Sequence, residues 1–180
     1  MEFCPLEISG VVLVKPKVHG DARGFFAEIY REKEFSEAGI DVAFVQDNQS
    51  RSSKGVLRGL HFQPDQAKLV RVSRGTIFDV VVDLRKESLT YKQWVETELS
   101  DENMWELYVP IGFAHGFVVL SDVADVCYRV GPGYYNPATE KGIRWNDPDV
   151  NVEWPVTDPS VSERDNSAPT LAEMESEITF

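Results

Sequence analysis

The sequence predicts a mostly β protein, a barrel or sandwich with a few short helices. Short runs rich in Val, Ile, Phe and Tyr recur along the chain, and turn-forming residues stand between them. Helical patterns are confined to one charged segment near the N-terminus and to the C-terminal end. Many strands at short spacing, separated by turn signals, are typical of β-sandwiches and barrels.

The apolar runs define the expected strands in chain order. They are Val11–Val14, Phe44–Val45, Leu69–Val72, Ile77–Leu84, Trp94–Leu99, Trp105–Val109, Gly116–Leu120 and Ala124–Val130. Turns are expected at Lys54-Gly55, Arg74-Gly75, Ser100-Asp101-Glu102-Asn103 and Ser121-Asp122, because Gly, Asp, Asn and Ser favour turn conformations.

Two regions carry helix signals. Arg31–Ala38 is charged with an internal Phe35, and Gly39 follows as a C-terminal cap. The last twenty residues are acidic and polar, and we expect one helix there, starting near Ser162. Between them, the Pro-, Asn- and Asp-rich stretch 132–159 is expected to be a loop with two strand-like pieces, Ile143–Trp145 and Val152–Trp154.

Length and charge limit the class of protein. The chain has 180 residues without repeats, so residues 1–180 are expected to form one domain. The formal net charge of −12 argues against a nucleic-acid or anionic-membrane binder. One anionic ligand remains compatible, because a few cations in a pocket can reverse the local field; Arg23, Arg58, Lys68 and Arg71 are candidates.

The N-terminus and the cysteines indicate the compartment. Met1-Glu2-Phe3-Cys4-Pro5 has neither a basic region nor a long apolar stretch, so no secretion signal is expected. No apolar run approaches the ~18 residues of a membrane span. The two cysteines, Cys4 and Cys127, do not form a disulfide framework. We therefore expect a cytoplasmic protein.

Two segments place a histidine among glycines and apolar residues. Gly55–Gln63 contains His61, and Pro110–Phe117 contains His115. Arg58 and Lys68 flank the first histidine. Burying so many polar groups on apolar strands is costly without a ligand or counter-charges, so we interpret the cluster as a site inside the barrel. For each histidine taken alone, a core residue with satisfied hydrogen bonds stays open.

The two segments resemble the two halves of a cupin-type jelly roll, and this resemblance raises the question of a metal. Metal-binding cupins usually supply His-x-His, a Glu and a second-half His. Here the first half reads His61-Phe62-Gln63, and the cationic Lys68 falls near the carboxylate position. Only His61 and His115 remain, fewer than the three or four ligands that a coordination shell needs. We expect no metal and no other cofactor.

A pocket with His, Lys, Arg and Tyr side chains suits acid–base chemistry beside a ketone. An imidazole accepts a proton near neutral pH. A lysine ammonium stabilises an enolate oxygen. A tyrosine on the far side can return a proton to the opposite face, which inverts a stereocentre. From these residues alone, epimerisation is one option among several.

At these residues the chain closely resembles the dTDP-4-dehydrorhamnose 3,5-epimerase family. This resemblance implies a cupin fold and action on dTDP-4-dehydro-6-deoxy-D-glucose in the synthesis of dTDP-L-rhamnose. The product would be dTDP-4-dehydro-L-rhamnose. The resemblance spans nearly the whole chain, through 20–26, 44–50, 55–63, 68–72, 79–85, 110–120, 134–135, 145–148, 154–155 and 162–165.

The resemblance also implies roles for individual residues. His61 would remove the protons at C3 and C5, and Asp165 would hold its ring. Tyr128 would deliver a proton from the opposite face, and Lys68 would stabilise the enolate oxygen. The implied substrate-binding residues are Arg23 and Arg58 on the diphosphate, Tyr135 stacked on the thymine, Gln46 and Asn48 on the nucleotide, and also Glu28, His115, Glu140 and Arg164.

Simpler local explanations exist for several of these residues. Asp165 follows Ser162 by three residues and suits the first turn of a helix, where the backbone dipole favours a carboxylate. Tyr128 alternates with apolar residues and suits a core position. Arg23 suits a turn on a solvated edge. Tyr134 and Tyr135 suit the rim of a barrel.

Alternative functions stay open at this point. One is a single-centre epimerase that inverts only C3 or only C5 of a related dTDP-4-keto-6-deoxy sugar. Another is a non-catalytic cupin that binds sugar nucleotides, and a third is a metal-dependent cupin isomerase or dioxygenase. The resemblance implies a homodimer in which an N-terminal strand of one subunit adds to the sheet of the other. The strand Val11–Val14 suits pairing within or between chains.

Overall fold

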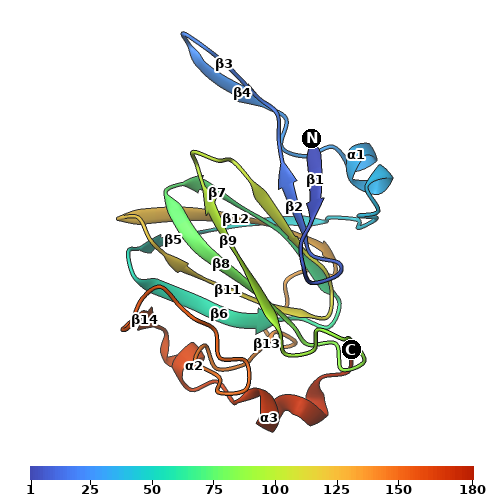
Figure 1. The fold of residues 1–180 in the computed structure, drawn as a ribbon, viewed down its shortest axis with the longest axis vertical. Helices are drawn as coiled ribbons and strands as arrows, with labels where there is room; N and C mark the ends of the chain where they lie inside the picture. The colour runs from blue at the N-terminus through green and yellow to red at the C-terminus, as the bar shows by residue number, and fades with distance from the viewer.

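The computed structural model describes residues 1–180 as two β-sheets packed face to face (Figure 1). The first sheet has the strand order β1 (Glu2–Pro5), β2 (Val12–Lys15), β10 (Glu106–Val109), β7 (Gln66–Arg74), β12 (Val123–Pro132) and β5 (Gln46–Ser53). The second sheet has the order β13 (Lys141–Gly142), β6 (Val56–Phe62), β11 (Phe113–Val119), β8 (Thr76–Asp83) and β9 (Trp94–Ser100), and β14 (Ser160–Val161) pairs parallel to β6.

An apolar core lies between the sheets and fills one half of the space. Val70 and Val72 of β7 and Val126 of β12 meet Val81 of β8 and Phe117 of β11. Inward side chains alternate along each strand, as the pleat requires. This half of the sandwich supplies the burial that holds the two sheets together.

The outer face of the second sheet and one end of the first sheet are also covered. The C-terminal segment packs Leu171, Met174 and Ile178 against Leu60 and Val80 of the second sheet, and Figure 1 shows α2 and α3 below β6. Phe35 of α1 (Glu32–Glu37) covers one end of the first sheet. Strand β8 lies between β11 and β9, and its run Val80-Val81-Val82 is apolar because both of its faces are buried there.

The helix expected at Arg31–Ala38 is confirmed as α1. Its C-cap is Ala38, and Gly39 follows with a φ of 85°, a left-handed conformation that glycine adopts without a Cβ clash. The longest helix of the structure has six residues, and none is long and apolar enough to cross a membrane.

The single C-terminal helix was a wrong prediction. The structure has α2 (Glu163–Asn166), α3 (Leu171–Met174) and the 3-10 turn η1 (Glu175–Glu177). Ser162 caps the first of these through its hydroxyl, which accepts a hydrogen bond from the Asp165 N–H. Pro169 lies in the break, where it cannot donate to a continuing helix.

The strands expected at Ile143–Trp145 and Val152–Trp154 do not form. Only Lys141–Gly142, just before the first piece, pairs as a strand. The loop between the two pieces is held by Asp147, whose buried carboxylate accepts hydrogen bonds from the backbone N–H groups of Asp149, Val150 and Leu171. A side chain thus satisfies the backbone donors of this loop, and of the first piece only Ile143 exchanges backbone hydrogen bonds with Leu60 of β6.

The strand expected at Phe44–Val45 is displaced. Those residues precede the polar strand β5, which pairs with β12 along its whole length. β5 is an edge strand with inward Asn48 and Ser50, so it lacks the apolar alternation that strand rules detect. The other expected strands are confirmed, with ends that differ by at most three residues.

Two strands near the N-terminus form a separate hairpin, β3 (Val18–Asp21) and β4 (Gly24–Ala27). The strands pair only with each other, and Figure 1 shows the hairpin extending away from the two sheets. Phe25 and Phe26 are 65% and 71% exposed there. Strand β2 pairs with β1 and β10 of its own chain.

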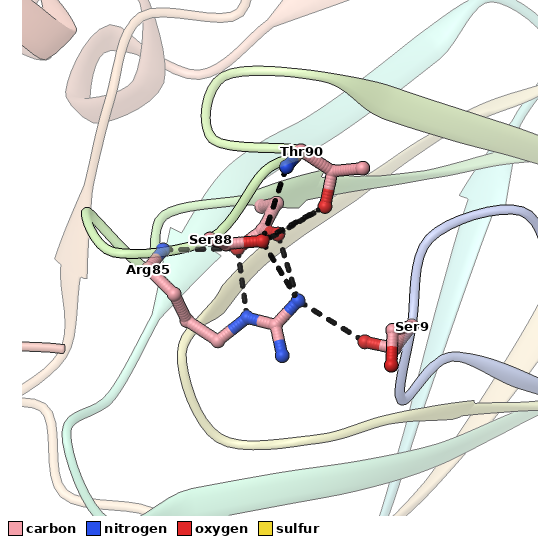
Figure 2. A network of polar contacts seen from close by, with 5 residues as sticks. Ser9, Arg85, Ser88 and Thr90 are labelled. Atoms are coloured by element: carbon pink, nitrogen blue, oxygen red, sulfur yellow. Dashed lines mark hydrogen bonds and ion pairs between the residues drawn. The ribbon is translucent and has the colours of Figure 1, made fainter.

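A polar network closes the end of β8 (Figure 2). The fully buried Asp83 accepts hydrogen bonds from Arg85, Ser88 and Thr90. The guanidinium of Arg85 also donates to the Ser9 carbonyl, which joins this loop to the N-terminal turn. Burial works to raise the pKa of Asp83, but these hydrogen bonds outweigh it and lower the pKa to about 2.

Candidate active site

A cavity of about 410 Å³ opens between the two sheets, in the half that the apolar core leaves free. Four of its 14 lining residues are hydrophobic, and the lining comes from both sheets, from the loop after β12 and from α2. The lining residues are Asn48, Gln49, Ser50, Arg58, His61, Gln66, Lys68, His115, Phe117, Tyr128, Val130, Tyr135, Glu140 and Arg164.

The alternation of the strands explains why this half is polar. On β7, Gln66 and Lys68 line the cavity, and the next inward residues, Val70 and Val72, belong to the core. On β12, Val130 and Tyr128 line the cavity before Val126 enters the core. Each strand therefore carries a polar half for the cavity and an apolar half for packing.

His61 on β6 is held by Asp165 of α2. The His61 Nε2 lies 2.6 Å from Asp165 Oδ1, and the two side chains are 23% and 6% exposed. A carboxylate only accepts hydrogen bonds, so Nε2 carries the proton and Nδ1 of the neutral ring is left as an acceptor. Burial works to raise the pKa of Asp165, but the hydrogen bond from His61 and that from the Gly59 N–H outweigh it and lower the pKa.

A second buried pair lies behind the cavity. His115 Nε2 is 2.8 Å from Asp79 Oδ2, and the side chains are 4% and 0% exposed. The other carboxylate oxygen, Asp79 Oδ1, has no hydrogen-bond partner. Burial raises the pKa of Asp79, against the opposing effect of His115. The pair fixes the His115 ring at the cavity wall.

Lys68 brings a cation into the cavity from the first sheet. Its Nζ donates only to the His61 carbonyl, at 3.4 Å, and forms no ion pair. Burial of the ammonium lowers the pKa of Lys68 to about 8, while Glu140 and Asp79 oppose that change. Its remaining donors are available to an anionic or carbonyl oxygen in the cavity.

Tyr128 faces the same cavity from β12. Its hydroxyl lies 3.1 Å from Ser50 Oγ on the neighbouring strand β5. Its ring packs edge-on against His115, with ring centroids 6.3 Å apart. Burial raises the pKa of Tyr128 well above its usual value, although Ser50 and Arg58 oppose that change. The side chain is therefore a phenol at neutral pH.

Polar contacts order the mouth of the cavity. Arg164 pairs with Glu140 at 2.6 Å, and the Tyr135 hydroxyl donates to the same carboxylate. The Gln46 side chain accepts from the Tyr135 N–H and donates to Asn48 Oδ1. Arg58 donates through Nε to Ser52, which leaves the rest of its guanidinium free for a ligand.

Gln63 does not face the cavity. Its amide donates to Asp65 and to the Tyr134 carbonyl, and its oxygen accepts from the Asn136 N–H. Through these hydrogen bonds, Gln63 connects the end of β6 to the loop that carries Tyr135. Nowhere in the structure do three His, Cys, Asp or Glu side chains come together in a way that would hold a metal ion.

The structure brings most of the predicted site residues together. Nine of them line the cavity: Asn48, Arg58, His61, Lys68, His115, Tyr128, Tyr135, Glu140 and Arg164. Asp165 and Gln46 lie directly behind, bonded to lining residues. Arg23 and Glu28 lie outside this cavity: Arg23 pairs with Asp21 on the hairpin, and Glu28 pairs with Arg31.

Five lining residues were not predicted: Gln49, Ser50, Gln66, Phe117 and Val130. Four of these lie two residues from a predicted one on the same strand, as Ser50 does from Asn48. The period of two along a strand was the signal that would have found them.

Comparison with known proteins places this geometry in a family. Residues 5–173 match the family model described as dTDP-4-dehydrorhamnose 3,5-epimerase. The chain is 51% identical over 169 residues to the dTDP-4-dehydrorhamnose 3,5-epimerase of Salmonella typhimurium, with 91% of this chain and 92% of the relative covered. The chain belongs to the dTDP-4-dehydrorhamnose 3,5-epimerase family.

Other members of the dTDP-4-dehydrorhamnose 3,5-epimerase family add structure and contrast. A solved epimerase from Legionella pneumophila, in complex with dTDP-4-keto-L-rhamnose, superposes with a TM-score of 0.94 at 44% identity, covering 98% of this chain and 96% of that one. A dTDP-4-dehydrorhamnose 3-epimerase from Streptomyces niveus is 44% identical over 177 residues, covering 96% of this chain and 85% of the relative. The predicted family and the cupin-type fold are confirmed, and the chain is an isomerase.

Proposed function

We propose that the chain converts dTDP-4-dehydro-6-deoxy-D-glucose to dTDP-4-dehydro-L-rhamnose by inverting C3 and C5. The observation that carries the proposal is the position of two side chains in one cavity. His61 enters from the second sheet and Tyr128 from the first. A base and an acid on opposite walls are what inversion requires, because the proton must leave one face of the carbon and arrive at the other.

The first step is proton abstraction beside the ketone. The free Nδ1 of His61 takes the proton from C5, and the electron pair of the C–H bond moves to give an enolate with its charge on O4. The Asp165 carboxylate supports the imidazolium that forms. The Lys68 ammonium enters the cavity from the first sheet, 3.4 Å from the His61 carbonyl oxygen, and stabilises the enolate oxygen.

The second step delivers a proton to the opposite face. The Tyr128 hydroxyl gives its proton to C5, the enolate collapses to the ketone, and Tyr128 becomes a phenolate. When His61 has lost its extra proton and Tyr128 has regained one, the same sequence inverts C3. Arg58, Arg164 and Tyr135 at the cavity mouth hold the nucleotide diphosphate part of the substrate.

The test is proton NMR of the reaction in deuterium oxide. Deuterium entering at both C3 and C5, with the L-rhamno product, is the expected result. Deuterium and inversion at one carbon alone would assign the chain to the single-centre reaction instead, as the name of the 44%-identical Streptomyces niveus relative describes. Binding of dTDP without any exchange would assign it to the non-catalytic alternative.

We also propose that the working form is a cytoplasmic homodimer in which the hairpin β3–β4 of one copy reaches the cavity of the other. Arg23 supports this, because the resemblance implies diphosphate binding, yet its side chain is 90% exposed on the hairpin of its own chain. The exposed Phe25 and Phe26 support it too, because exposed aromatic pairs favour burial against a partner.

Mixed dimers test this arrangement. Arg23→Ala and His61→Asn chains, each nearly inactive at low substrate, are combined through two affinity tags. If Arg23 acts across the dimer, each mixed dimer contains one intact site and recovers about half of the wild-type rate. If Arg23 acts within its own chain, no site is intact and mixing restores nothing. Sedimentation of the wild type as a monomer at micromolar concentration would also contradict the proposal.

A further inference from the structure

Ser50 is the one hydrogen-bond partner of the Tyr128 hydroxyl. The two oxygens are 3.1 Å apart, and either can be the donor. Tyr128 pairs in register with Asn48 on β5, and Ser50 follows two residues later on the same inward face. Both Ser50 and Tyr128 line the cavity. Strand geometry thus places the Ser50 hydroxyl within hydrogen-bond distance of Tyr128, and Ser50 forms no side-chain hydrogen bond to any other ionisable group.

The double inversion sets a requirement on Tyr128 that a single step does not. Each inversion consumes the phenol proton, so the phenolate must be reprotonated between C5 and C3. His61 is no direct donor for this, because its hydrogen bond goes to Asp165 and no hydrogen bond joins it to Tyr128. The buried phenolate is also costly and needs a hydrogen-bond donor while it exists.

Strand β5 offers a route to solvent. It is an edge strand of the first sheet, and Ser50 itself is half-buried beside the exposed Gln49 and Arg51. A serine hydroxyl has one donor and two acceptor positions, so it can donate to the phenolate while it accepts from water. Ser52, the next inward residue, has a different partner, because its hydroxyl oxygen accepts a hydrogen bond from Arg58 Nε.

We infer that Ser50 is the positioning residue that returns a proton to Tyr128 between the two inversions. The Ser50 hydroxyl passes its proton to the phenolate oxygen, and its own oxygen takes a proton from a water molecule in the same movement. Serine ends unchanged, tyrosine is a phenol again, and the hydroxide left in water takes up the proton that His61 releases. This inference rests on the proposed epimerase function and adds a group to it.

The role has a consequence for the products. When reprotonation of Tyr128 is slow, His61 still removes protons, and the enolate regains a proton from His61 on the original face. Solvent exchange then continues without inversion. The singly inverted intermediate also has time to leave before the second centre reacts. Loss of Ser50 should therefore uncouple exchange from inversion rather than slow both equally.

The experiment compares Ser50→Ala, Ser50→Thr and Ser52→Ala in deuterium oxide, with Tyr128→Phe as the limit of full uncoupling. For Ser50→Ala we expect kcat for inversion to fall about 10- to 100-fold, the range for a lost hydrogen bond to a charged group. Its ratio of exchange to inversion should rise, and singly inverted product should accumulate. Ser50→Thr keeps the hydroxyl and should restore the wild-type ratio.

Ser52→Ala is the matched control, because it removes a hydroxyl two residues away on the same face of β5. It should raise KM through Arg58 and leave the ratio of exchange to inversion unchanged. Thermal unfolding checks that Ser50→Ala folds; if it does not, Ser50→Cys keeps the volume with a weak donor and gives the same readout.

Equal loss of exchange and inversion in Ser50→Ala, or an unchanged ratio, would overturn the inference. So would a folded Ser50→Thr that stays uncoupled. Failure of the proposed function is separate, because it requires that the wild type itself exchange no deuterium at C3 or C5.

Discussion

His61 Nε2 and Asp165 Oδ1 lie 2.6 Å apart and join strand β6 to helix α2 across 104 positions of sequence. The contact depends on the cap of a four-residue helix, because the Ser162 hydroxyl accepts from the Asp165 N–H and fixes the start of α2. The carboxylate of Asp165 also accepts from the Gly59 N–H, two residues before His61. A short capped helix therefore sets the orientation of the proposed base.

His61→Asn should strongly reduce turnover and keep ligand binding. Asparagine preserves approximate size and hydrogen bonding but takes no proton at pH 7. Loss of a general base costs about 10²- to 10⁴-fold in rate, so kcat should fall within that range. Calorimetry should find the dTDP affinity nearly unchanged, because Arg58 and Tyr135 are untouched. A variant that kept more than about a tenth of wild-type turnover would show that His61 is not the base.

Asp165→Asn should change the tautomer of His61. The carboxamide can donate to Nε2, which favours a proton on Nδ1 and removes the acceptor from the cavity side. We expect kcat to fall about 10²-fold or more with little change in KM. The ¹⁵N chemical shifts of the His61 ring report the tautomer directly. Wild-type kcat together with an unchanged tautomer would contradict this account, and Ser162→Ala serves as a control for helix capping alone.

The predictable part of the fold is the part that is buried on both faces. The run Ile77–Leu84 was recognised as a strand because it is rich in Val and Ile, and most of β8 is buried on both faces. β5 was missed because its inward residues Asn48 and Ser50 face a polar cavity, so the strand carries no apolar alternation. The loop around Asp147 is held by hydrogen bonds from backbone N–H groups to its carboxylate, which hydrophobic periodicity does not predict.

The site divides in a similar way. His61 and Lys68 were recognisable from local clustering of polar groups on apolar strands. Asp165 reaches His61 only through the tertiary fold, and its local sequence equally suits a helix start, which it also forms. Its place behind His61 was therefore implied by family resemblance alone. The roles of Arg23 and Glu28 stay predictions, because both lie away from the cavity of their own chain.

Lys68→Arg should move the alkaline limit of activity. Burial lowers the pKa of Lys68 to about 8, so the ammonium is present below that pH and is lost as the pH rises through it. The profile of kcat/KM reports groups of the free enzyme, and we expect its alkaline limb near this value in the wild type. Arginine stays protonated throughout, so Lys68→Arg should lose rate through its different shape but should also lose this limb.

Lys68→Met separates charge from shape, because it fills similar volume without a cation. It should lower kcat more than Lys68→Arg does and should also show no alkaline limb near pH 8. A limb that persisted unchanged in both variants would assign that titration to another group.

Asp83→Asn should make the stability of the protein less dependent on acid. The folded pKa of Asp83 is about 2, below the ~3.9 of an unfolded aspartate. A depressed folded pKa stabilises the native state above the unfolded pKa, and this contribution is lost as the pH falls from about 4 through about 2. Its size at neutral pH is on the order of 2 kcal/mol, since the side chain is fully buried.

Urea unfolding of wild type and Asp83→Asn at neutral pH and at several acidic values measures this contribution. The difference in free energy of unfolding should be largest at neutral pH and should shrink as the pH falls from about 4 toward 2. Asp21→Asn is the matched control, because Asp21 also pairs with an arginine but lies on the exposed hairpin, where ion pairs contribute little. A difference that stayed constant across the acidic range would mean that Asp83 stabilises the loop by packing and neutral hydrogen bonds alone. Its ionisation would then have no part in holding Arg85 and the Ser9 turn together.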